Sequence, residues 1–143
     1  MAAENTPTPV APETETRATK KVKKHKQNVP SGQAHIQATF NNTIISITDK
    51  KGAVLVTSSA GANGFRGSKK GTAYAAQVAA EKVAEIAKRE HGMNSIDVYI
   101  KGIGLGRDSA IRAISTQSIS IASITDQTPI PHGGVRPKGE RKP

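Results

Sequence analysis

The chain has 143 residues, of which 35% are hydrophobic and 3% aromatic, and its formal net charge is +10. This length suits one domain with a thin core, and the absence of cysteine excludes disulfides, thiolate metal sites and a cysteine nucleophile. No stretch approaches the roughly 18 apolar residues of a membrane span, and no signal or transit peptide is recognisable at the start. We therefore expect a cytoplasmic protein.

The first 30 residues are predicted to be a disordered extension that is acidic and then basic. Residues 1–16 are rich in Pro, Thr and Glu, whereas residues 17–26 carry six cations and no acid. Such a run either is a solvated tail or binds a polyanion, because lysines that neutralise phosphates release counterions from nucleic acid. The lysines in this segment are Lys20, Lys21, Lys23, Lys24 and Lys26.

Three antiparallel strands are expected next. "AHIQATF" (34–40) alternates, which places Ile36, Ala38 and Phe40 on a buried face and His35, Gln37 and Thr39 on the other. Asn41 and Asn42 are typical of a turn, and "TIISIT" (43–48) and "AVLVTSS" (53–59) are rich in β-branched residues.

The period then changes to that of a helix. Alanines and Val83 recur at three- and four-residue steps between Thr72, a good N-cap, and His91-Gly92, which suits a helix end. A strand is predicted over 95–100, a short helix capped by Asp108 or Ser109, and a strand over 118–125. The order βββαβαβ predicts a single α/β domain over 31–128, with a mixed five-stranded sheet and two helices, followed by a basic tail over 129–143.

The segment "GFRGSKKGT" (64–72) combines an aromatic ring, three cations and three glycines. Phe65 either stacks on a base or sugar or fills the thin core. Arg66, Lys69 and Lys70 lie where no core residue is needed, and glycines let a backbone approach closely. The segment therefore favours a nucleic-acid backbone as ligand.

The segment "KGIGLGRDSAIR" (101–112) follows a strand and opens a helix, a context that binds phosphate. It is not a dinucleotide fingerprint, because Arg107 stands where a third glycine is needed. A tight turn with glycines at positive φ explains Gly102, Gly104 and Gly106. It does not explain Arg107 and Arg112 beside Lys101, which favour contact with an extended phosphate backbone.

Catalysis has little support in the sequence. The order βββαβαβ is also that of ribonuclease H-like enzymes, which need clustered carboxylates for two-metal chemistry. The first strand has none, and Glu81, Glu85 and Asp97 remain isolated, while the four histidines show no metal or triad spacing. We expect no enzyme activity, no metal and no cofactor.

Four sequence segments are specific enough to indicate a family: "AHIQATFNNTIISITDKKG", "GFRGSKKGTAYAAQVAAE", "KGIGLGRDSAIRAI" and "ITDQTPIPHGGVRPKGERK". In order and spacing they resemble the bacterial form of the small-ribosomal-subunit protein eleven family over residues 20–143. The acidic leader over 1–16 has no counterpart in that family, and Ile103 and Leu105 stand where many relatives have proline.

The resemblance implies a ribonuclease H-like fold without the enzyme's carboxylates, and a structural role on the platform of the small (30S) subunit. There it implies bridging of 16S ribosomal RNA helices and proximity to the Shine-Dalgarno cleft, to messenger RNA and to initiation factor three. It also implies proteins seven and eighteen as neighbours, no membrane and no homo-oligomer. The alternatives are a free-standing nucleic-acid binder and a nucleotide-using enzyme.

The RNA-contacting residues that we predict combine these motifs with the two basic ends. They are the five lysines of residues 17–26 together with Asn41, Asn42, Phe65, Arg66, Gly67, Ser68, Lys69, Lys70, Gly102, Gly104, Gly106, Arg107, Arg112, His132, Arg136, Lys138, Arg141 and Lys142.

Overall fold

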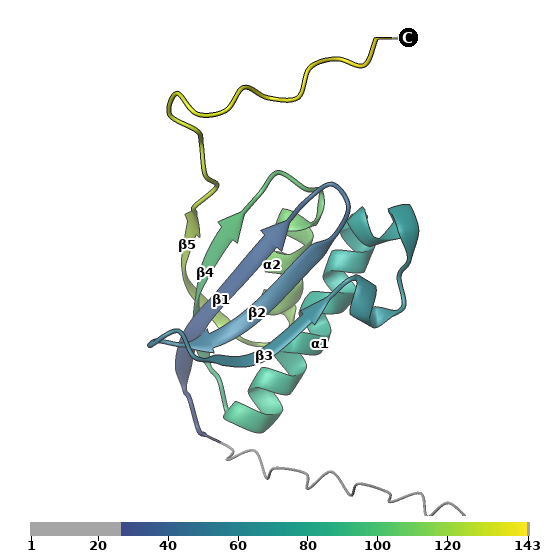
Figure 1. Cartoon of the computed structure of the whole chain (residues 1–143). Coiled ribbons are helices and arrows are strands. Elements are labelled where there is room, and N and C mark those ends of the chain that lie inside the picture. The colour runs from purple at the N-terminus through teal and green to yellow at the C-terminus, as the bar shows by residue number, and fades with distance from the viewer. Residues whose placement is uncertain (1–26, 143) are drawn as a thin grey trace, which may run out of the picture.

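The structure, a computed structural model, describes residues 27–142 and confirms the predicted order of elements (Figure 1). Two short 3-10 helices, η1 and η2, replace the loop expected before the long helix. The elements are β1 (Ser31–Ala38), β2 (Thr43–Asp49), β3 (Val54–Ser59), η1 (Gly61–Asn63), η2 (Gly67–Gly71), α1 (Ala73–His91), β4 (Ser95–Lys101), α2 (Gly106–Thr116) and β5 (Ser120–Asp126).

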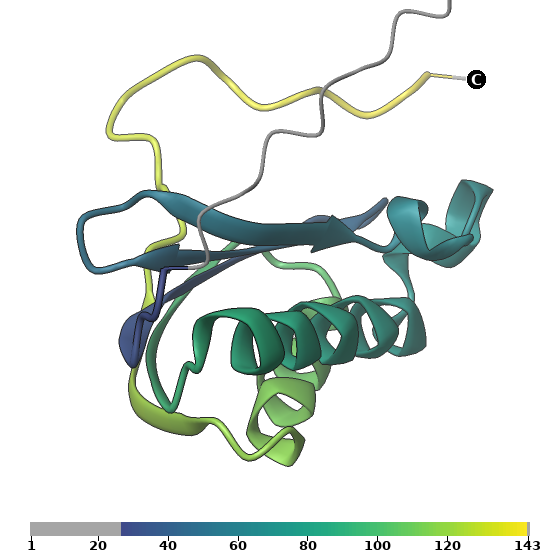
Figure 2. The same cartoon turned by 90° about the horizontal axis from the view of Figure 1, so that it is seen from below.

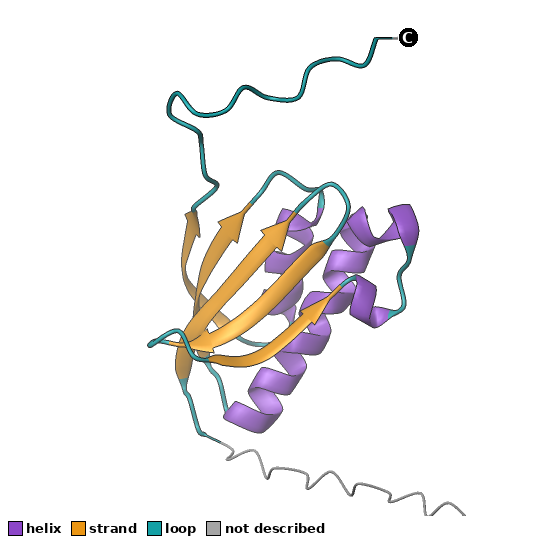
Figure 3. Ribbon diagram, in the orientation of Figure 1, coloured by secondary structure: helices purple, strands orange, loops and turns teal. Residues whose placement is uncertain are grey.

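The five strands form one mixed sheet in the order β3-β2-β1-β4-β5. β1 pairs with β2 and β2 with β3 in antiparallel register, whereas β1–β4 and β4–β5 are parallel. Both helices cover the same face of this sheet, and no helix of residues 27–142 lies on the opposite face (Figures 2 and 3). The described part of the chain therefore has two layers and leaves one sheet face open. No helix of the described part is long and apolar enough to cross a membrane.

The core lies between the sheet and the helices and is built mainly from Ile, Val and Ala side chains. Small alanine side chains let α1 lie close to both the sheet and α2. Thr72 caps α1 as predicted, because its hydroxyl accepts a hydrogen bond from Ala75 N, and Gly92 ends the helix in the left-handed conformation. The stripe predicted for α1 consisted of Ala73, Ala76, Ala80, Val83, Ala84 and Ala87. All of these except the half-buried Ala73 are buried, and Ala75 and Ala79 are buried as well.

Two expectations about local structure were wrong. Phe40 does not join Ile36 and Ala38 in the core: β1 ends at Ala38, a turn follows, and the Phe40 side chain is 71% exposed. Neither Asp108 nor Ser109 caps α2, because this helix already begins at Gly106, and its N-cap residue Leu105 provides no side-chain hydrogen bond.

Candidate nucleic-acid interface

Three of the predicted segments meet at one end of the sheet, at the top and upper right of Figure 1. Because β1 and β4 are parallel, the β1–β2 turn (39–42) and the β4–α2 turn (102–105) both leave from this end. The 3-10 helix η2 and the start of α1 lie beside the β1–β2 turn. Residues that are 60 positions apart in the sequence thus form one surface, which we call the loop end and define as residues 39–42, 61–72 and 102–107.

Close backbone packing explains why the loop end contains so many glycines. A side-chain carbon at three of them would overlap a carbonyl oxygen of β1 or of the β1–β2 turn. The added carbon would lie 2.1 Å from Phe40 O at Gly71, 2.0 Å from Ala38 O at Gly102 and 2.3 Å from Thr39 O at Gly104.

Positive φ, in contrast, explains only part of the glycine pattern. Gly102 has φ +97°, but Gly104 and Gly106 do not lie in the left-handed region. The alternative explanation that all three glycines serve positive φ is therefore wrong for two of them. Gly104 is required by its approach to Thr39, and Gly106 by its contact with Thr43 and Ala76.

The basic residues of 64–72 lie on the outside of the loop end. Arg66 donates to the carbonyl of Gly61, while Lys69 and Lys70 occupy the last turn of η2. Within residues 27–142 none of the three forms an ion pair. Phe65 is half-buried and packs edge-to-face on Tyr74, with ring centroids 5.9 Å apart. It is not part of the main core.

Arg107 is engaged within the chain. Its guanidinium donates to the carbonyl of Gly102 at 2.6 Å and forms an ion pair with Asp126 at the end of β5 at 2.5 Å. The side chain is 28% exposed. Arg107 therefore ties the β4–α2 turn to β5, so removing it would loosen the turn as well as remove a charge.

Asp126 is held in its ionised form at this junction. Hydrogen bonds from the Thr128 hydroxyl, from Arg107 and from the Thr128 amide lower the pKa of Asp126 from 3.8 to about 2. Because this pKa is depressed on folding, the carboxylate stabilises the protein fully above about pH 4, and that contribution is lost as the pH falls toward 2.

We expect Asp126→Asn to destabilise the protein at pH 6 but much less at pH 2, where about half of the wild-type carboxylates are protonated and most of their pH-dependent stabilisation is lost. Unfolding midpoints of both proteins, measured across this range, give the comparison. Thr128→Val should also raise the pKa of Asp126 toward its ordinary value, as followed by NMR of the carboxyl carbon. An equal gap between wild type and Asp126→Asn at both pH values would contradict the assignment.

The C-terminal segment begins at the loop end. Gln127 N donates to Ile100 O, and the Thr128 hydroxyl accepts from Gly102 N, which fixes the exit point beside the β4–α2 turn. Residues 127–142 contain no helix or strand. The predicted contacts of this segment, all exposed, are His132, Arg136, Lys138, Arg141 and Lys142.

Other predicted contacts are not brought to the loop end. Arg112 is exposed on α2, more than one turn beyond its start. The five lysines between Lys20 and Lys26 lie outside the described residues. The chain reaches β1 from the other end of the domain, where Val29 N donates to His91 O at the end of α1.

The carboxylates weighed for two-metal chemistry remain apart. No group of three or more His, Asp or Glu side chains in residues 27–142 could hold a metal ion. Asp97 on β4 accepts from Ser123 on β5, and Glu81 accepts from Gln77 on the surface of α1.

The open face of the sheet carries an aromatic pair that none of the sequence motifs predicted. His35 on β1 and Tyr99 on β4 are register partners, and their rings lie 5.4 Å apart at an interplanar angle of 15°. Alternation had already assigned His35 and Gln37 to the polar face of a strand. No local sequence pattern predicted that Tyr99 would lie beside His35, because strand pairing is a long-range property.

Comparison with known proteins identifies the family. The family model for ribosomal protein S11 matches residues 32–142. The chain belongs to the ribosomal protein S11 family. Two relatives, each named small ribosomal subunit protein uS11, come from Psychromonas ingrahamii and Idiomarina loihiensis. Each is 51% identical over 129 residues, covering 90% of this chain and 97% of the relative.

Membership of the S11 family confirms the resemblance drawn from the four sequence segments. It makes the chain a structural constituent of the small ribosomal subunit and not an enzyme. The alternative of a nucleotide-using enzyme was therefore wrong. The matched range begins at Gly32, next to the start of β1, and includes the loop end and most of the basic C-terminal segment.

Proposed function

We propose that the loop end binds folded 16S ribosomal RNA and that the chain bridges RNA helices on the platform of the small subunit, in the cytoplasm. The observation that carries this proposal is the convergence of η2, the β4–α2 turn and the exit of the basic tail at one end of the sheet. Exposed cations there have few partners within the described chain, so they are available to phosphates.

The positions of the chain ends support bridging. The C-terminal segment starts at the loop end, whereas the described chain begins at Gln27 at the opposite end of the domain, and the five lysines precede it in the sequence. Basic segments that connect to opposite ends of one domain can reach different RNA helices. We extend the proposal to the neighbours that the family resemblance implied: proteins seven and eighteen, the messenger RNA cleft and initiation factor three.

Hydroxyl-radical footprinting of 16S ribosomal RNA with the full chain tests this function. We expect protection on at least two helices that are separate in the RNA secondary structure, and loss of one set of protections when residues 127–143 are removed. Protection of a single helix would contradict bridging. If most of the protein sediments apart from the small subunit in a high-salt sucrose gradient, the result would instead favour a free nucleic-acid binder.

A further inference from the structure

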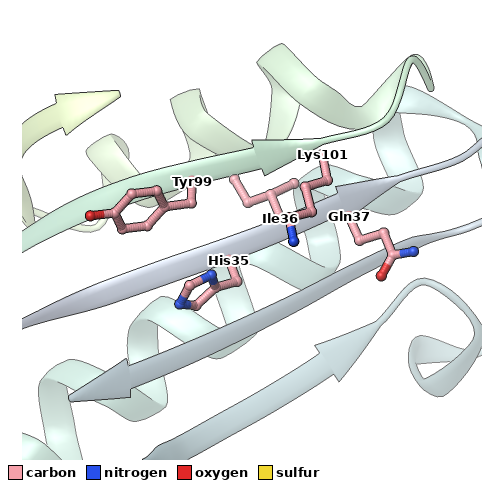
Figure 4. Close-up of a pocket in the computed structure, with 5 residues that line it drawn as sticks. All are labelled: His35, Ile36, Gln37, Tyr99 and Lys101. Atoms are coloured by element: carbon pink, nitrogen blue, oxygen red, sulfur yellow. The ribbon is translucent and has the colours of Figure 1, made fainter. Parts of the chain in front are cut away.

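We propose that the open face of the sheet holds one unpaired RNA base on the ring pair of His35 and Tyr99. Gln37 would contact the base edge and Lys101 the adjoining phosphate (Figure 4). This site is distinct from the loop end and rests on the proposed function, since it needs RNA beside this face.

The two rings form a stacked pair, which we call the platform. His35 and Tyr99 come from adjacent parallel strands, and their rings are nearly parallel and 5.4 Å apart. Both side chains are half-buried, so part of each ring remains accessible beside the hollow (Figure 4). Unpaired bases stack on aromatic side chains in this way, and stacking tolerates any base because each has a π-face.

The platform borders a hollow of about 140 Å³ that is lined also by Ile36, Gln37 and Lys101. Pockets for whole small molecules usually measure about 300–1,000 Å³, so this hollow suits one ring inserted from a longer polymer. Gln37 is the register partner of Lys101, and both are exposed. The Gln37 amide, which can both donate and accept hydrogen bonds, thus lies beside the Lys101 cation. This pair suits a nucleotide, because the amide can bind the base edge while the cation binds the phosphate.

The electrostatics of the hollow favour RNA over an acidic or apolar protein segment. No acid lines the hollow. Asp97, the acid on the same face of β4, lies on the other side of Tyr99 and is bonded to Ser123. Burial lowers the pKa of His35 and the nearby charge of Lys101 lowers it further, which favours the neutral imidazole as a stacking surface.

The hollow is continuous with the proposed interface. Lys101 is the last residue of β4 and directly precedes Gly102 of the loop end. The segment that follows β5 also runs on the open side of the sheet, opposite to the helices (Figure 2). An RNA strand bound at the loop end can therefore pass along Lys101 onto the open face.

Binding of protein-free 16S ribosomal RNA by full-chain variants, at fixed salt, tests the site. Stacking of one base predicts that Tyr99→Leu weakens binding by about tenfold, or about 1.4 kcal/mol, whereas Tyr99→Phe keeps the affinity. Gln37→Ala should weaken binding by about threefold. Gln33→Ala is the matched control, because Gln33 lies on the same strand and face but outside the hollow. Circular dichroism and thermal unfolding show whether each variant is folded.

Ultraviolet cross-linking of the wild-type complex supplies a second measurement. We expect a nucleotide attached to the peptide that contains Tyr99. Wild-type affinity in folded Tyr99→Leu and Gln37→Ala, with no such cross-link, would overturn this site while the proposed function stands. Cross-links from Lys101 to another protein in assembled subunits would overturn it in favour of a protein partner. A wild-type chain that binds no ribosomal RNA would overturn both proposals.

Discussion

Replacing Arg66, Lys69 and Lys70 together by alanine is expected to produce the largest loss of RNA affinity. Each phosphate contact that is lost lowers the slope of log affinity against log salt by about 0.7 to 0.9, so three contacts lower it by about 2 to 2.7. If the slope of the variant is smaller by 2, the affinity advantage of the wild type at 0.1 M salt exceeds its advantage at 1 M salt by about a hundredfold. Titrations of 16S ribosomal RNA at several salt concentrations measure this slope.

The matched control removes the same charge elsewhere. Lys50, Lys51 and Lys82 are exposed, and the β2–β3 turn that holds the first two lies at the opposite end of the sheet from η2 (Figure 1). Their replacement should change the slope much less. A second variant, with only Lys69 and Lys70 replaced, leaves the hydrogen bond of Arg66 to Gly61 intact. Equal slopes for wild type and the triple variant would mean that these cations face solvent.

Gly104→Ala is expected to lower the free energy of unfolding by about 2 kcal/mol, because the new methyl group would overlap the Thr39 carbonyl and force the backbone apart. Gly102→Ala should cost more, since it adds strain at φ +97° to a similar overlap with Ala38. Chemical denaturation of the full chain measures both. The RNA affinity of the folded molecules, measured separately, shows whether this turn also binds phosphate.

Two further glycines distinguish the cost of backbone strain from the cost of steric overlap. Gly64 has φ +90° but open space around it, so Gly64→Ala should cost only the strain, about 1 kcal/mol. Gly139 has neither a positive φ nor a neighbour, and its replacement should be neutral within about 0.5 kcal/mol. A cost for Gly104→Ala no larger than that for Gly139→Ala would show that the two turns can move apart.

Local signals determined the order of elements. Period-two alternation predicted β1 and period-three-to-four recurrence predicted α1, because each side chain's burial there depends on neighbours within the same element. The caps at Thr72 and Gly92 were predictable for the same reason, since a cap satisfies backbone groups one to four residues away. The candidate segments 64–72 and 102–107 were also recognisable, because Gly and cations are concentrated there.

The tertiary structure alone decided which of these segments contact one another. Gly71 and Gly104 approach the β1–β2 turn, Arg107 binds Asp126 nineteen residues away, and Tyr99 becomes the neighbour of His35. These contacts depend on strand order and register, which local periodicity does not encode. Phe40 was misplaced because alternation cannot tell where a strand stops and a turn rotates the next side chain outward. The sequence by itself thus determined the elements and the family, and long-range strand pairing decided which residues share a surface.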